Sequence, residues 1–146
     1  MKNAEVLNDL VEINNDRVAG YEKAAGKTKD TDLNSLFADM ARQSKEFVSE
    51  LKGLVRSEGE EPAKGTTVRG KIYRAWMDVK QTFSGDDRKS ILSSCEFGED
   101  AAQRAYENAL KDSELSPSVR QILEKEKSSL RQSHDRIRDM RDAASA

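Results

Sequence analysis

The sequence predicts an all-α protein built as a four-helix bundle, and two observations carry that prediction. Four long stretches repeat apolar side chains at spacings of three and four residues, which is typical of helices with one buried face. Helix-breaking residues are rare, because the chain of 146 residues contains only eight glycines and two prolines. Since this length suits one domain, we expect residues 1–146 to form a single bundle.

The first two helices are expected at residues 3–25 and 32–57. Gly26 can end the first helix in a left-handed conformation, and Asp30 or Thr31 can cap the second. The short turn between them makes the two helices antiparallel neighbours. The first helix presents an inward stripe of Leu7, Leu10, Val11, Asn14, Val18, Tyr21 and Ala25.

The remaining helices are expected at residues 68–83, 87–111 and 117–142. Ser116 is a good N-cap for the last one, with Pro117 at the first helical position. Two antiparallel pairs joined by one long connection, here with a short extra helix in it, make the ferritin-like form of the four-helix bundle.

An internal repeat supports that arrangement. The segment GYEKAA at 20–25 resembles AYENAL at 105–110, and ARQSKEFVSEL at 41–51 resembles LRQSHDRIRDM at 130–140. The two halves of the chain therefore look like copies related by a pseudo-two-fold axis.

Glu99 is the residue on which the functional question turns. It lies near the middle of an otherwise apolar or aromatic stripe, where an unpaired carboxylate would be costly. Alignment of the two halves puts polar residues of the other helices at the same level. We therefore expect a central polar layer of Asn14, Arg17, Gln43, Ser44, Glu99, Ser133 and His134. Periodicity leaves open whether Ser133 or His134 points into the core.

A di-iron carboxylate site does not fit this layer. Such a site takes a glutamate from each of two helices and a Glu-x-x-His motif from each of the other two. Asn14 aligns with Glu99 in the repeat. Arg131 stands three positions before His134, and the second helix contains no histidine. We therefore expect no cofactor and no metal, with an Arg17–Glu99 ion pair neutralising the carboxylate. Iron or manganese held by Glu99 and His134 is the alternative.

No other motif points to catalysis. Cys95 lies on the apolar stripe, where a thiol is usually a small hydrophobe. Tyr21 and Tyr106 are expected as core rings with a hydroxyl handle. The chain has neither a glycine-rich phosphate loop nor the spacing of a catalytic triad, so a non-enzymatic role is favoured.

The expected helix at 68–83 offers a binding surface. Basic and apolar faces together are typical of a helix that docks on a membrane surface or on a protein partner. The simpler interpretation, which we favour, is that this helix covers the outside of the bundle. The residues concerned are apolar Ile72, Trp76 and Phe83 and basic Arg69, Lys71, Arg74 and Lys80.

Composition excludes several classes of protein. A net charge of −2 and a pI near 5.6 argue against a nucleic-acid binder. No apolar run approaches the roughly 20 residues of a membrane span, and the N-terminus lacks the apolar region of a signal peptide. A single cysteine provides no disulfide framework. We expect a cytoplasmic protein.

Several segments also resemble a known family. LNDLVEINNDRVAGYEKAA, FADMARQSKEFVSELK, RAWMDVK, CEFGEDAAQRAYENAL and HDRIRDMRD are similar to an uncharacterised bacterial family of ferritin-like four-helix-bundle proteins. The resemblance extends from about Leu7 to Asp142. It implies a ferritin-like fold and a bacterial cytoplasmic protein, and it implies no activity and no catalytic residues.

Three functional hypotheses follow from these observations. The first is a non-catalytic bundle, with a polar layer in place of a metal site, that acts by packing or partner binding, for example as a homodimer. A stress-related role for it is only an analogy with other proteins of the fold. The second is a metal-dependent oxidase or peroxide scavenger that uses Glu99 and His134. The third is a membrane-surface or protein adaptor that binds through the helix carrying Trp76.

Overall fold

The computed structural model describes residues 2–63 and 87–144. Within these ranges the chain forms α1 (Lys2–Lys27), α2 (Thr31–Ser57), α4 (Arg88–Leu110) and α5 (Pro117–Ala143). Each of these helices begins and ends within two residues of its predicted bounds. The helix expected at 68–83 lies outside the described residues, together with all of its candidate binding residues.

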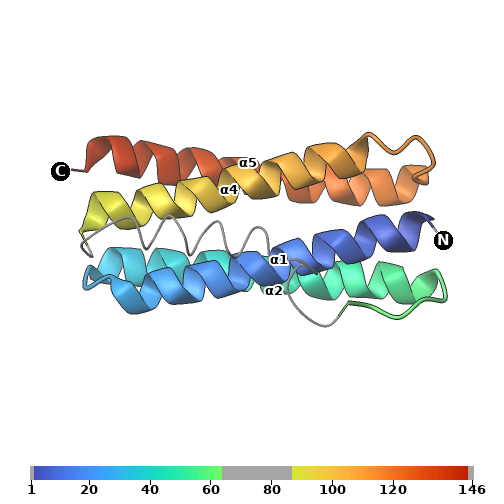
Figure 1. Ribbon diagram of the computed structural model, residues 1–146, viewed down its shortest axis with the longest axis horizontal. Coiled ribbons are helices and arrows are strands. Elements are labelled where there is room, and N and C mark those ends of the chain that lie inside the picture. The colour runs from blue at the N-terminus through green and yellow to red at the C-terminus, as the bar shows by residue number, and fades with distance from the viewer. Residues whose placement is uncertain (1, 64–86, 145–146) are drawn as a thin grey trace.

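The helices form two antiparallel pairs that pack as two layers (Figure 1). α1 packs on α2 and α4 packs on α5, and the two pairs meet mainly through α1 and α4. α2 and α5 touch each other only slightly. The predicted all-α four-helix bundle is therefore confirmed for the part of the chain that the structure describes. None of these helices is long and apolar enough to cross a membrane.

Both helices of the second pair begin with a side-chain cap. Ser116 Oγ accepts a hydrogen bond from the Val119 amide at 3.4 Å, and Pro117 is the first helical residue, as predicted. Asp87 acts in the same way at the start of α4, where it accepts from the Ser90 amide at 3.3 Å. These caps fix where the two helices start, and so which residues of each lie at mid-length.

The turn between α1 and α2 differs from the prediction. α1 continues through Gly26, which does not adopt a left-handed conformation. The side-chain amide of Asn34 instead donates to the Ala25 carbonyl at 2.7 Å, so the end of α1 is capped from α2. Asp30 stands at the N-cap position of α2 but makes no capping hydrogen bond. Its carboxylate accepts from Arg88 at 3.2 Å and so ties this turn to α4.

Among the described residues, the apolar core forms two clusters, one towards each end of the bundle. The first includes Leu7, Leu10, Val11, Leu51, Val55, Ala102, Tyr106, Leu123 and Leu130. The second includes Tyr21, Leu33, Phe37, Met40, Leu92, Cys95 and Ile137. Along every helix, buried polar residues fall between members of the two clusters: Asn14, Arg17, Ser44, Glu99, Ser133 and His134. The candidate site therefore lies at the middle of the bundle.

Candidate functional site

An ion pair between α1 and α4 lies at the centre of the bundle. Arg17 Nη2 is 2.8 Å from Glu99 Oε2, and Arg17 Nε donates to both carboxylate oxygens at 3.2 Å. Both residues have a relative exposure of 0%. Charges removed from water this completely are tolerated only where an opposite charge and hydrogen bonds replace the lost hydration. Each of these two side chains supplies that replacement for the other.

Tyr21 completes the surroundings of Glu99. Its hydroxyl donates to Glu99 Oε2, and the Arg17 guanidinium lies 5.1 Å from the centre of its ring. Burial, and then the Glu99 carboxylate, hold the pKa of Tyr21 well above its ordinary value, so the phenol remains a donor. Burial is the largest influence on Arg17 and lowers its pKa, but Glu99, with smaller contributions from Tyr21 and Tyr106, outweighs it, so the pKa is raised. A protonated phenol and a guanidinium therefore surround one carboxylate.

The other side of the guanidinium is held by α2. Arg17 Nη1 donates to Ser44 Oγ at 2.8 Å and to the Met40 carbonyl at 3.2 Å. Ser44 in turn donates to Asn14 Oδ1 at 2.9 Å. The Arg17 side chain thus joins α1, α2 and α4, and hydrogen bonds on both sides fix its position.

The network reaches α5 through a second tyrosine. Asn14 Nδ2 donates to the Tyr106 hydroxyl at 2.8 Å, and that hydroxyl donates to Glu126 Oε1 at 2.7 Å. Burial, and then a hydrogen bond with Glu50, raise the pKa of Glu126 to about 9. At neutral pH Glu126 is therefore a neutral acid. Side chains from all four described helices take part in this network.

Glu126 and Glu50 are not among the site residues predicted from the sequence. The signal for Glu126 was its position between Leu123 and Leu130, which places it on the inward stripe of α5. Glu50 offered no such signal, because it is an exposed residue of α2. It meets Glu126 only through the tertiary structure, which periodicity along one helix does not describe.

Ser133 and His134 are both buried, but they face different helices. Ser133 donates to Gln43 Oε1 of α2 at 3.2 Å, whereas His134 Nε2 lies 2.6 Å from Asp100 Oδ1 of α4. The open question of which residue faces the interior therefore has no single answer. The structure joins four of the seven predicted layer residues in one network and places the other three in separate contacts: Asn14, Arg17, Ser44 and Glu99 in the network, and Gln43, Ser133 and His134 outside it.

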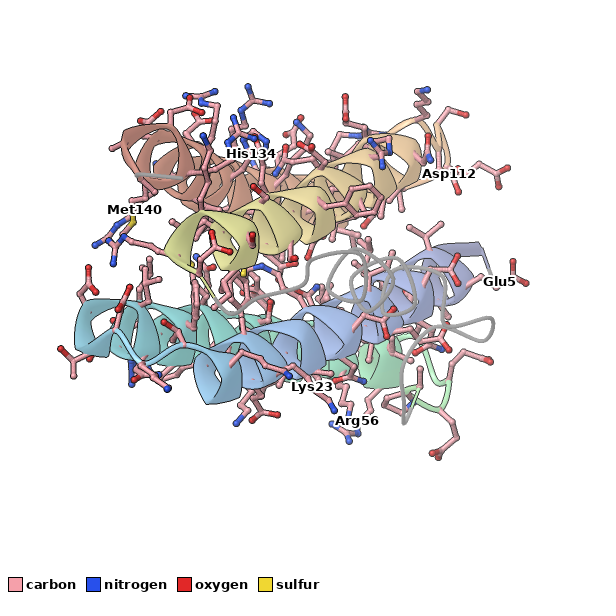
Figure 2. The ribbon with its side chains drawn as sticks, turned by 60° about the vertical axis from the view of Figure 1, so that its left-hand side comes forward. Glu5, Lys23, Arg56, Asp112, His134 and Met140 are labelled. Atoms are coloured by element: carbon pink, nitrogen blue, oxygen red, sulfur yellow. The ribbon has the colours of Figure 1, made fainter. Side chains whose placement is uncertain are left out.

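His134 belongs to a second polar cluster, on the seam between α4 and α5. Figure 2 shows it at mid-length of this helix pair, between Met140 and Asp112. One donor atom from each of Glu96, Asp100 and His134 lies within 4.8 Å of the others. Glu96 and Asp100 are not among the predicted site residues, although they flank Glu99 on the same helix.

Glu99 and His134, the two residues that would bind a metal in the alternative hypothesis, lie in two different clusters. Glu99 contacts Arg17 and Tyr21, whereas His134 contacts Asp100. The two residues are thus engaged on different sides of α4, and no common ion is implied by their contacts.

The interior residues do not fit a di-metal centre. A metal needs donor atoms with free lone pairs, and the guanidinium of Arg17 offers only N–H groups. Both oxygens of Glu99 already accept hydrogen bonds, from Arg17 and Tyr21. At the same level Asn14 and Ser44 supply neutral oxygens and no carboxylate. We therefore derive no metal chemistry from this layer.

The four described helices and their pairing place the protein in the class of ferritin-like four-helix bundles. Among solved structures the chain is similar to a mutant of Dps1 from Mycobacterium smegmatis, with a TM-score of 0.80 and 13% sequence identity, over 94% of this chain and 93% of that one. At this identity the likeness establishes the fold alone. The chain belongs to a family described as a domain of unknown function (DUF2383), which matches residues 2–112. No curated protein matches it. The predicted fold and the resemblance to an uncharacterised ferritin-like family are confirmed.

Proposed function

We propose that the protein is a non-catalytic ferritin-like bundle in which a buried ion-pair network takes the place of a metal centre, and that it acts by packing or by binding a partner. The observation that carries this proposal is the state of Glu99. Its two oxygens accept hydrogen bonds from Arg17 and Tyr21, and its side chain has no exposure to solvent. A carboxylate held in this way has no position open for a substrate or for exchange of a proton with water.

The network is suited to fixing how the helices align. A buried polar group specifies register because any shift of one helix along another separates it from its partner. Here Arg17 binds Glu99 on α4 and Ser44 on α2, so a shift by one turn, about 5.4 Å, would leave a buried charge unpaired. The polar layer therefore supports a single arrangement of α1, α2 and α4.

Because the buried network stabilises the fold in this proposal, the function would be carried out by binding at the surface of the bundle. The candidates are a homodimer, a protein partner and a membrane surface bound through the helix that the sequence predicts around Trp76, and all three stay predictions. The cytoplasmic location and the stress-related role are likewise predictions. The metal-dependent oxidase is the less favoured function, because the interior donors that it needs are engaged with each other.

Metal content tests this proposal. We would purify the wild-type chain, Glu99→Gln and His134→Gln without chelators and measure iron, manganese and zinc by mass spectrometry, with circular dichroism to confirm folding. We expect that the Glu99→Gln change leaves whatever metal is present unaltered. The proposal fails if near-stoichiometric metal is present in the wild-type chain and disappears in a folded Glu99→Gln variant, whether or not His134→Gln also loses it.

A further inference from the structure

We propose that Glu96, Asp100 and His134 form a binding site for a divalent transition-metal ion on the seam between α4 and α5. The site is independent of the buried network and goes beyond the proposed function. Its donors are one imidazole nitrogen and two carboxylate oxygens, all within 4.8 Å of one another. Mixed nitrogen and oxygen donors suit first-row ions such as zinc, and the ions from manganese to copper compete for the same donors.

The imidazole of His134 is already oriented for a metal. Its Nδ1 lies 3.0 Å from Asp135 Oδ1, while its Nε2 faces Asp100 Oδ1 at 2.6 Å and Glu96 Oε2 at 3.9 Å. Histidines that bind metals commonly donate their second ring N–H to a carboxylate, which fixes the tautomer and leaves the other nitrogen for the ion. Because Asp135 is the next residue on α5, this orienting contact does not depend on α4.

The two carboxylates approach from one face of α4, since Glu96 and Asp100 are four residues apart on that helix. Donor atoms that share one ion at about 2.1 Å stand about 3.0–3.4 Å from each other in octahedral or tetrahedral geometry. The distances of 2.6 and 3.9 Å from His134 Nε2 lie on either side of that range. Asp100 is 48% exposed, so its side chain can adjust and water can fill the remaining positions.

A neighbouring cation sets how Glu96 can bind. Arg141 Nη1 is paired with Glu96 Oε1, which leaves Oε2 as the oxygen directed towards His134. Glu96 would therefore bind an ion through one oxygen, with Arg141 opposing the charge of the metal. The other oxygen would keep its arginine, so binding requires no rearrangement of the ion pair. An ion held in this way would link α4 to α5.

Zinc is the probe for the test, and the sequence provides a clean reporter because His134 is the sole histidine. We would add Zn²⁺ to ¹⁵N-labelled protein and follow both imidazole nitrogens by NMR. We expect Nε2 to take the chemical shift of a metal-bound nitrogen by one equivalent while Nδ1 keeps its proton. Absence of any shift with millimolar Zn²⁺ would overturn the proposal.

Variants separate a built site from general attraction of cations to carboxylates. We expect His134→Gln to weaken Zn²⁺ binding by more than about 100-fold, and Asp135→Asn by about 10–100-fold, because it frees the imidazole from its orienting carboxylate. Asp100→Asn, a change at a half-exposed position that should leave the fold intact, is expected to weaken binding by at least about tenfold. Asp39→Asn alters an exposed carboxylate of α2 and is expected to change nothing.

Equal Zn²⁺ affinity in the wild-type chain and Asp100→Asn, or an equal loss in Asp39→Asn, would contradict the proposed site. Arg141→Gln distinguishes a metal site from a cluster with only a structural role, because only a metal site would change its affinity for Zn²⁺ when this cation is removed. With the opposing cation removed, the affinity for Zn²⁺ should rise several-fold, and a lower affinity would count against the geometry. Failure of this site leaves the proposed function intact, because that function is overturned only by metal whose binding depends on Glu99.

Discussion

Glu99 is held by two kinds of contact that differ in strength. A hydrogen bond to a charged group contributes about 1.5–3 kcal/mol, so the Tyr21 hydroxyl is a substantial partner. Loss of one member of a buried ion pair costs about 3–5 kcal/mol, because it leaves the other charge unpaired. Arg17 is therefore the dominant contact of Glu99, and Tyr21 is the weaker one.

Glu126 makes the stability of the protein depend on pH. Its pKa is about 9 in the folded protein against an ordinary value of 4.5, so the folded chain holds a proton that the unfolded chain releases. The stability that this proton contributes is fully present below about pH 4.5 and is lost as the pH rises to about 9. The expected slope is at most about 1.4 kcal/mol per pH unit.

The variant Glu126→Gln should remove this slope. Glutamine keeps the shape of the side chain and can accept from Tyr106, but it does not titrate. Urea unfolding at pH 5, 7 and 9 measures the effect as the difference between the two proteins. We expect the variant to gain stability relative to the wild-type chain as the pH rises. An unchanged difference across this range would show that Glu126 does not hold a proton in the folded state.

Some residues of the site could be predicted from the sequence and others could not. The position of Glu99 on an apolar stripe was predicted, and so was its pairing with Arg17, which lies one turn from Asn14. Glu126 lies on an equally regular stripe and was readable in principle. The contact of Glu96 and Asp100 with His134 could not be predicted from the sequence, because it depends on how α4 and α5 align and not on periodicity along either helix.

α4 carries both clusters on different faces. Glu99 points inward to Arg17, while Glu96 and Asp100 lie on the side that meets α5. Successive residues on a helix point about 100° apart, so Glu99 and the adjacent Asp100 face different surroundings, whereas Glu96 and Asp100, four residues apart, share a face. The bounds of α4 were predictable from the same periodicity, whereas the use of its second face was not.

The helix ends show why some local signals succeeded and others failed. The Ser116–Pro117 start of α5 was predictable, because a cap and its helix are adjacent in sequence. Gly26 and Asp30 carried equally plausible local signals. They were overridden by Asn34, which caps the end of α1, and by Arg88, which takes the carboxylate of Asp30.

Ser116→Ala tests the cap of α5. It removes the acceptor for the Val119 amide, and we expect a loss of about 1 kcal/mol in the free energy of unfolding. Ser128→Ala makes the same chemical change at an exposed position within α5 and should stay within about 0.5 kcal/mol of the wild-type chain. Chemical denaturation measures both. Equal effects of the two changes would show that the hydroxyl of Ser116 does not cap the helix.

At the scale of the whole molecule, the two tyrosines make corresponding contacts between the pairs. Tyr21 on α1 bonds to Glu99, and Tyr106 on α4 bonds to Asn14. Each partner is the residue seven positions before the other tyrosine. A two-fold relation between the halves would generate this pair of contacts, which supports the internal repeat, still a prediction. Arg17 has no counterpart in the second half of the chain, because the matching position is Ala102. The buried positive charge is therefore present in the first half of the repeat and not in the second.

The whole bundle is organised around a carboxylate that is neutralised by the protein itself, and a double-mutant cycle on Arg17 and Glu99 tests this most directly. Arg17→Met, Glu99→Gln and the double variant would be compared with the wild-type chain by urea unfolding at pH 7 in the presence of a chelator, which removes any contribution from bound metal. We expect each single change to cost about 3–5 kcal/mol and the double variant to cost less than their sum by at least about 2 kcal/mol. Costs that add within about 0.5 kcal/mol would contradict the account, because they would mean that the arginine and the carboxylate do not stabilise each other.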